Sequence, residues 1–243
     1  MDFTLKKYEE LLDSLKDYEF ETLILRHDVD LFPFNSLRTA SIEAEKEMFG
    51  IYYFRAVPES WDESVIREIA AFGHEIGYHY ESLTTCEGNV DRAYKDFCKN
   101  LEALRKIVPV RSICMHGSPR SPYDSKDIWK KYDYKALGIE SEPYLDTDFS
   151  KVFYLTDTGR RWDGYKVSVR DKIPQYQDEW TARGLTFHST EDVIDGLRQG
   201  VIPKGLMVTV HPQRWNSFGI AWCKELALQN VKNIVKRLII KKK

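Results

Sequence analysis

The sequence predicts an α/β fold in which a parallel sheet, open or closed into a barrel, carries helices on its outer side. Along 243 residues, short apolar runs alternate with segments of helical periodicity. Several apolar runs end in Asp or His, and active sites of parallel α/β folds gather at the carboxyl ends of strands. The runs with the length of buried strands are residues 22–26, 51–56, 75–80, 111–115, 136–140, 152–156 and 206–211.

Helical patterns lie between several of these runs. Apolar spacing of three to four residues, or an acidic first turn, predicts helices over residues 36–49, 63–72, 90–106, 190–199 and 218–239. Asp62 is a suitable N-cap, and Gly50 and Gly73 are suitable stops. Residues 141–190 are the least regular and are expected to form long loops that shape a pocket. No linker divides the chain, so residues 1–243 are expected to form one domain.

Charge and cysteine content narrow the class of function. The net charge of -2 gives no global basic field for nucleic acid. The chain has no run of 18 apolar residues and no signal-like start, so no membrane span is expected. Its four cysteines form no C-x-x-C pair, which favours free thiols and a cytoplasmic location. Lys236, Arg237 and residues 241–243 are expected to form a solvated basic tail, with contact to an acidic membrane surface or a polyanion as the alternative.

The strongest chemical signal is the segment Arg26-His27-Asp28-Val29-Asp30, which follows an apolar run directly. Burying unpaired charge at a strand end is costly, so this cluster requires a metal ion or a catalytic role. In an extended segment Asp28 and Asp30 lie on one side, and two such carboxylates share either a proton or a cation. Pairing with Arg26 or His27 would keep Asp28 ionised.

Histidines end three further strand-like runs. His79, His116 and His211 each stand at or near the carboxyl end of such a run, whereas His74 alternates to the other face and is expected to be structural. His188 precedes a predicted helix and is expected to belong to its capping region. Aspartate with imidazole suits zinc, with iron, cobalt or nickel as alternatives, and two histidines with one carboxylate leave positions free for water and substrate.

These motifs resemble the polysaccharide deacetylase superfamily, which includes the NodB-type carbohydrate esterases. Asp28-Val29-Asp30 is similar to the family's Asp-Asp motif, and Gly73-His74-Glu75-Ile76-Gly77 precedes His79 as it precedes the family's first histidine ligand. Val208-Thr209-Val210-His211 is similar to the last motif. The resemblance covers about residues 20–215. Leu83 stands where the second histidine ligand is expected, and the sequence looks closest to a divergent branch among surface-polysaccharide biosynthesis enzymes, in which His116 supplies the missing imidazole.

The resemblance implies a distorted (β/α)7 barrel, a divalent metal and hydrolysis of an N-acyl bond, in particular N-acetyl, on a sugar of lipopolysaccharide or capsule biosynthesis. We expect Asp30, His79 and His116 to bind zinc, Asp28 to act as the general base and His211 to protonate the departing amine. The expected substrate is an N-acetylated sugar, nucleotide sugar or oligosaccharide. A catalytically inactive carbohydrate-binding homologue, suggested by Leu83, and an amidohydrolase of a small non-sugar amide are the alternatives.

Five residues are candidates for contact with substrate. Arg55 could orient Asp28 or the substrate, or form a simple surface salt bridge. A backbone N–H near Tyr123 could bind the oxyanion. In the segment 157–162, Trp162 could stack on a sugar ring and Asp157 could bind hydroxyls, with Arg161 beside them. The alternative for that segment is a loop salt bridge with a buried indole.

Overall fold

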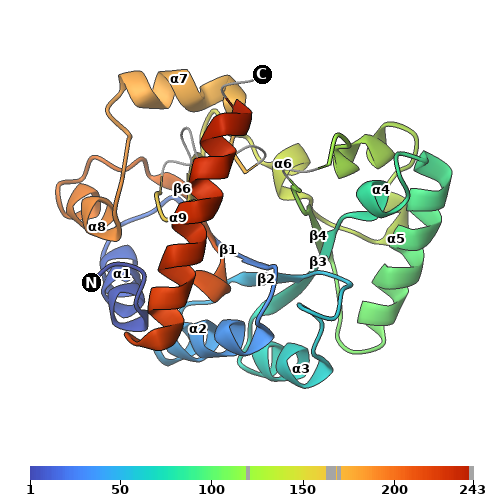
Figure 1. Ribbon diagram of the computed structural model, residues 1–243, viewed down its shortest axis with the longest axis horizontal. Helices are drawn as coiled ribbons and strands as arrows, with labels where there is room; N and C mark the ends of the chain where they lie inside the picture. Colours follow the sequence, from blue (N-terminus) through green and yellow to red (C-terminus); the bar gives the residue numbers. More distant parts are fainter. Residues whose placement is uncertain (119–120, 163–167, 169–170, 241–243) are drawn as a thin grey trace.

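The computed structural model describes residues 1–118, 121–162, 168 and 171–240. Six parallel strands form one sheet in the order β4-β3-β2-β1-β6-β5. The sheet is curled into a half-barrel with helices around it (Figure 1). The strands are β1 (Thr22–Val29), β2 (Ile51–Phe54), β3 (Glu75–Tyr80), β4 (Ser112–Met115), β5 (Phe153–Thr156) and β6 (Gly205–Val210).

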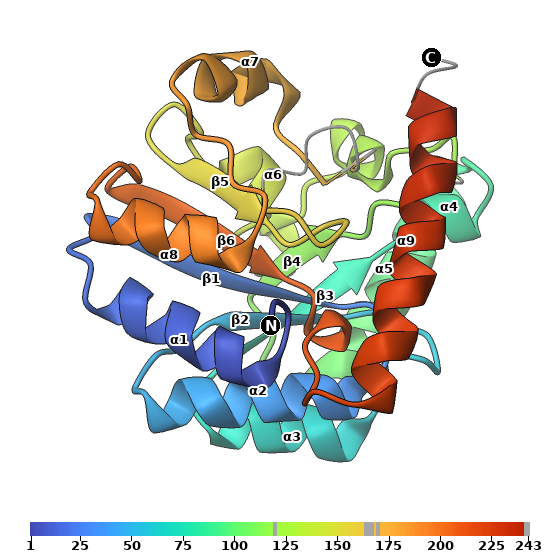
Figure 2. The same ribbon diagram turned by 60° about the vertical axis from the view of Figure 1, so that its left-hand side comes forward.

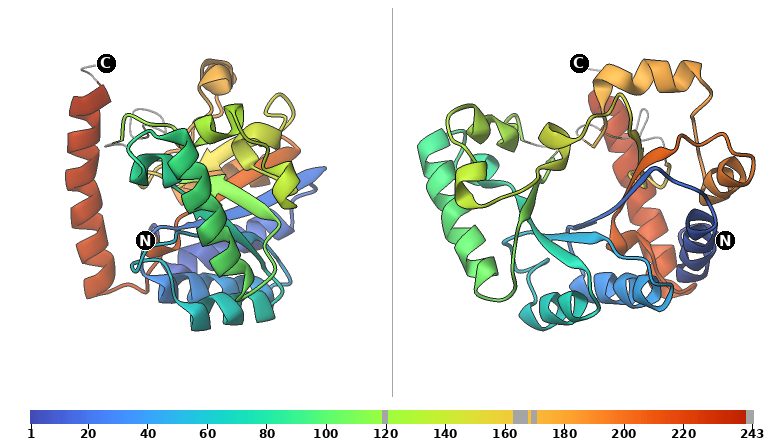
Figure 3. Two further views of the ribbon diagram at one scale, coloured as in Figure 1. Left: turned by 90° about the vertical axis from the view of Figure 1, so that its right-hand side faces the viewer. Right: turned by 180° about the vertical axis from the view of Figure 1, so that it is seen from behind.

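Helices follow most of the strands and cover the outer face of the sheet. In the order of the chain, the described helices are α1 (Leu5–Lys16), α2 (Pro33–Glu45), α3 (Glu63–Ala71), α4 (Ser82–Thr85), α5 (Val90–Arg105), η1 (Ser125–Lys130), η2 (Lys135–Leu137), α6 (Pro143–Asp146), α7 (Pro174–Ala182), α8 (Thr190–Arg198), η3 (Pro212–Arg214) and α9 (Ile220–Ile240). Helices α1, α2 and α3 lie side by side along one side of the sheet (Figure 2). Helix α9 runs along the edge of the molecule (Figure 3).

Local capping explains where several helices begin. The side chain of Asp62 accepts the N–H groups of Ser64 and Val65 at the start of α3, as the sequence predicted. Ser189 and Asp192 form a reciprocal capping box at the start of α8, so the His188 segment does precede a capped helix.

The structure corrects part of the strand and helix prediction. Residues 136–140 do not form a strand, because the chain makes a 3-10 turn over Lys135–Leu137 and Gly138 then takes a positive φ of 69°. Beyond this turn, the N–H of Glu140 donates to the carbonyl oxygen of Arg111 at 2.6 Å, and a single isolated bridge joins Ser141 to Ser112 of β4. The described sheet therefore has six strands where seven were expected. Helices α1 and α7 were not predicted, although α1 has a clear apolar face of its own.

Alternation along β1 places His27 on one face of the sheet and Arg26 with Asp28 on the other. His27 points outward to the helices, where its Nε2 atom lies 2.6 Å from Glu43 of α2 and 3.1 Å from the hydroxyl of Tyr8 on α1. Arg26 and Asp28 point to the concave side, where the guanidinium of Arg26 lies 4.7 Å from the ring centre of Tyr144. The concave side of the sheet is thus charged, whereas most of the remaining core is apolar.

The structure also bears on the expectations about the cysteines and about membrane-spanning segments. All four cysteines are free thiols, and Cys86 and Cys114 are buried. In the described part of the chain, none of the helices combines the length and the apolar character that crossing a bilayer requires.

Candidate metal and active site

Three strand ends bring a carboxylate and two imidazoles to one point. Asp30 follows β1, His79 lies near the end of β3 and His116 follows β4. The Oδ1 atom of Asp30 lies 3.7 Å from Nε2 of His79 and 3.5 Å from Nε2 of His116. One ligand atom from each of the three residues lies within 4.8 Å of the others. The structure therefore brings together the three residues that the sequence singled out as metal ligands.

Both imidazoles are held with Nε2 facing Asp30. The Nδ1 atom of His79 lies 2.9 Å from the carbonyl oxygen of Cys114, which can only accept a hydrogen bond. The Nδ1 atom of His116 lies 2.9 Å from a carboxylate oxygen of Glu81. Nδ1 therefore carries a proton in both rings, and Nε2 is the nitrogen that faces Asp30. Burial lowers the pKa of His79 to about 4, so this ring is neutral at neutral pH.

The three residues fit a divalent cation. Oδ1 of Asp30 is buried and has no hydrogen-bond partner among the described residues. Although burial raises the pKa of Asp30, the neighbouring His116, His211 and His79 hold it well below its usual range, so the group is an anion. Ligands about 2.1 Å from a tetrahedral zinc ion lie about 3.4 Å apart, close to the separations from Oδ1. The side chains of Asp30 and His116 are 21% and 17% exposed, which leaves the site open to solvent.

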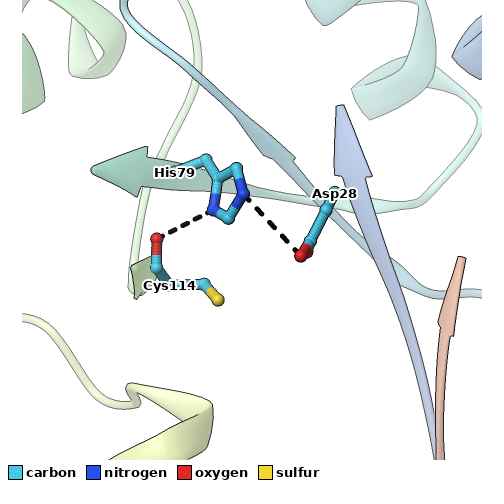
Figure 4. Close-up of side chains that lie close together, drawn as sticks. All are labelled: Asp28, His79 and Cys114. Atoms are coloured by element: carbon cyan, nitrogen blue, oxygen red, sulfur yellow. Dashed lines mark hydrogen bonds and ion pairs between the residues drawn. The ribbon is translucent and has the colours of Figure 1, made fainter. Parts of the chain in front are cut away.

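A second grouping of possible ligands, Asp28, His79 and Cys114, is fully buried beside the first (Figure 4). It fits a cation less well. Both carboxylate oxygens of Asp28 already accept hydrogen bonds from Arg26, at 2.8 and 2.7 Å. Burial holds the pKa of the Cys114 thiol well above its usual value, and a protonated thiol is a poor ligand.

The pair of Arg26 and Asp28 is a buried, bidentate ion pair on the concave side of the sheet. The sequence offered Arg26 or His27 as the partner of Asp28, and the structure shows that it is Arg26. The Oδ2 atom of Asp28 also lies 3.7 Å from Nε2 of His79. Each carboxylate oxygen has a second lone pair, so Asp28 can still accept a proton from a group near His79.

His211 lies across the site from β3 and is held by Asp157. Its Nδ1 atom lies 2.6 Å from Oδ1 of Asp157, whose carboxylate also accepts hydrogen bonds from Arg214 and from the indole of Trp215. Burial acts to lower the pKa of His211, as does Arg214. The charge of Asp157 and its hydrogen bond, with the charge of Asp30, outweigh both and raise the pKa above its ordinary value. His211 therefore retains a proton more readily than a free histidine.

Two residues that we expected to contact the substrate are buried in the structure. The side chain of Trp162 has no exposed surface, and its Nε1–H donates to the hydroxyl of Thr190 at 3.0 Å, so neither ring face is free to stack on a sugar. Asp157 is also fully buried, and its oxygens are taken by His211, Arg214 and Trp215. Asp157 therefore positions His211 and does not reach sugar hydroxyls. The alternative of a buried indole in this segment is the correct one.

The other three candidates for substrate contact lie as follows. Arg55 donates to Glu81 at 2.6 Å and to the backbone oxygen of Asp30 at 3.1 Å, so it supports the metal site without contacting Asp28. Tyr123 is 39% exposed, and its backbone N–H donates to Ser121 at 3.1 Å. Arg161 is half-buried next to Trp162.

The structure also adds polar residues that the sequence analysis did not identify. Glu81 orients His116, and Gln213 donates to the second oxygen of Asp30 at 3.1 Å. Asp171 accepts hydrogen bonds from four hydroxyl groups, those of Tyr144, Tyr154, Thr156 and Thr158. Glu81 and Gln213 each lie within two residues of a predicted histidine, a signal that could have drawn attention to them.

Leu83 and His74 occupy structural positions. Leu83 is 3% exposed and packs in an apolar cluster with Cys86, Ala93 and Ile128. His74 is buried between the carbonyl of Ala40 and the N–H of Gly50, in agreement with the structural role expected for it.

No protein-family model matches the chain, and no curated protein is similar to it at a significant level. The interpretation of the site therefore depends on its own residues and geometry.

Proposed function

We propose that the protein is a metal-dependent hydrolase that removes an N-acyl group, in particular an acetyl group, from a sugar. The observation that carries the proposal is the buried Oδ1 of Asp30, which has no hydrogen-bond partner among the described residues and faces the Nε2 atoms of His79 and His116 at 3.7 and 3.5 Å. Zinc is the ion that this ligand set suits best.

Asp30, His79 and His116 would hold the ion. When bound, a divalent cation lowers the pKa of a water molecule to about 7 and polarises an acyl oxygen. Asp28, ionised beside Arg26, takes up the proton of the attacking water. His211 lies close enough to Asp30 for their charges to interact and carries its proton on the other side of the site. Amines leave poorly as anions, so His211 donates that proton to the departing nitrogen.

The sugar, and its place in surface-polysaccharide biosynthesis, is supported by the motifs of β1, β3 and β6, which resemble those of the polysaccharide deacetylases. The curled parallel sheet is compatible with the barrel of that superfamily.

Metal binding and turnover test the two parts of the proposal separately. The purified protein should bind one zinc ion per chain, and Asp30→Ala should abolish this binding while the exposed control Asp178→Asn keeps it. Acetate release from N-acetylated nucleotide sugars or oligosaccharides should require the metal, and Asp28→Asn should abolish release while retaining the ion. Zinc binding unaffected by Asp30→Ala would refute the site, and turnover unaffected by Asp28→Asn would refute the mechanism.

A further inference from the structure

Helix α9 faces the rest of the molecule with polar side chains. The indole N–H of Trp222 donates to the backbone oxygen of Asp2 at 2.9 Å. Glu225 forms an ion pair with Arg160 at 2.5 Å, and the amide of Asn233 donates to the backbone oxygen of Gly159 at 2.8 Å. Together with the buried Gln229, these residues recur at helical spacing and define the inner face of α9.

The outer face of α9 carries large apolar side chains that are exposed. Ile220, Leu228, Val231 and Ile234 are 76%, 62%, 61% and 60% exposed. At 100° per residue, Ile220, Val231 and Ile234 lie within about 60° of one another and opposite Gln229. A surface helix normally buries its apolar face and exposes its polar one, so α9 has the reverse orientation. Figure 3 shows that no other element covers this side of the helix.

The segment that carries this apolar face is basic in sequence. Seven of residues 220–243 are Lys or Arg, and one is acidic. The acidic residue, Glu225, is turned inward to Arg160, whereas Lys224 and Lys232 are exposed. The outer face of α9 therefore combines apolar side chains with cationic ones and has no anion of its own.

We propose that the outer face of α9 binds the surface of an anionic lipid bilayer, with the helix lying in the plane of the interface. Apolar side chains flanked by Lys and Arg are the pattern of interfacial helices, in which the apolar side chains enter the acyl boundary and the cations meet anionic headgroups. From Ile220 to Ile234 the helix presents this face over about 21 Å. A second copy of the chain is a poorer occupant, because two such faces would bring cations together.

Two further apolar side chains are exposed near the start of α9, and the ring of one of them, Phe218, lies 5.6 Å from that of Trp222 on the inner face. Phe218, just before α9, is 65% exposed, and Phe34 at the start of α2 is 60% exposed. A hydrogen bond of 3.1 Å between Asn35 and Asn216 joins these two segments. This proposal is independent of the proposed enzymatic function, since it concerns residues outside the metal site.

The test is flotation of the full-length protein with phosphatidylcholine vesicles that do or do not contain phosphatidylglycerol. We expect binding only to the anionic vesicles, weakened by added salt. Val231→Glu should reduce binding about tenfold or more, because it places a charge at the interface and repels the headgroups. Val201→Glu, at a similarly exposed apolar residue away from α9, should bind as the wild type does.

Two results would overturn the proposal. The first is a vesicle assay in which binding does not depend on the anionic lipid or does not differ between the two glutamate variants. The other is a dimer in light scattering that Val231→Glu dissociates, which would assign the face to a second copy of the chain. Circular dichroism of both variants would check that α9 remains helical.

Discussion

The Nδ1 atom of His116 lies 2.9 Å from Oε2 of Glu81, and this contact determines which nitrogen of His116 faces Asp30. Arg55 fixes Glu81 in turn through two hydrogen bonds, at 2.6 and 3.1 Å. Burial raises the pKa of Glu81, but the hydrogen bond and charge of His116 with the charge of Arg55 outweigh it and hold the pKa at about 2. Glu81 is thus an anion that holds the ring of His116 with Nε2 facing Asp30, the orientation that the proposed metal site requires.

Glu81→Gln should weaken zinc binding without abolishing it. An amide can still accept from Nδ1, but it removes the charge that makes Nε2 a better ligand, and such changes cost about 10-fold to 100-fold in metal affinity. Titration calorimetry with zinc would measure the effect. Glu102→Gln, at an exposed position on α5, is the control and should leave the affinity unchanged. Equal affinities for the two variants would show that Glu81 does not support the site.

The convergence of Asp30, His79 and His116 could be predicted because parallel strands end at one edge of a sheet. Each residue follows or ends an apolar run that became β1, β3 or β4, so strand topology alone brought them together. The sequence left Arg26 and His27 as alternative partners of Asp28, and alternation along β1 explains why the structure pairs it with Arg26.

Other features depended on contacts that no local pattern encodes. The polar neighbours of Trp162 left sugar stacking and a buried indole as alternatives, and the structure shows it buried against Phe3 and Trp215 and hydrogen-bonded to Thr190. Asp171 lies in an irregular segment, and only the tertiary structure places it among four hydroxyl groups. The apolar residues in 136–140 resembled a buried strand. Ile139 is indeed buried, but the chain reaches this position through a 3-10 turn and not through a strand.

Asp157→Asn should destabilise the protein, because it leaves the buried guanidinium of Arg214 without its anion. Breaking a buried ion pair in this way costs about 3–5 kcal/mol. Burial raises the pKa of Asp157, but Arg214 and His211 outweigh it and hold the pKa below the ordinary 3.8. Its contribution is therefore present above about pH 4 and lost as the pH falls further. Urea unfolding should show that the loss in free energy of unfolding caused by Asp157→Asn shrinks below pH 4. The exposed control Asp195→Asn should unfold with nearly the wild-type free energy.

Thr190→Val should destabilise the protein by about 1–3 kcal/mol, because it leaves the buried indole N–H of Trp162 without an acceptor. Valine has nearly the shape of threonine, so lost packing contributes little. Thermal unfolding would measure the change, with the exposed Thr181→Val as control. Affinity for a sugar should remain at the wild-type value, and a selective loss of sugar binding would restore Trp162 as a substrate contact.

His79 makes the stability of the metal-free protein depend on pH. Burial lowers its pKa from 6.5 to about 4, so between these values the unfolded chain binds a proton that the folded ring does not. The free energy of unfolding should therefore fall as the pH is lowered through this window, by about 3 kcal/mol from His79. In chelator-treated protein, the free energy of unfolding of His79→Gln, measured with urea, should fall less steeply with falling pH than that of wild type. His188→Gln, at an exposed position, should keep the wild-type slope. If His79→Gln also kept it, the pKa of His79 would be the same in the folded and the unfolded chain, and burial would not hold the ring neutral.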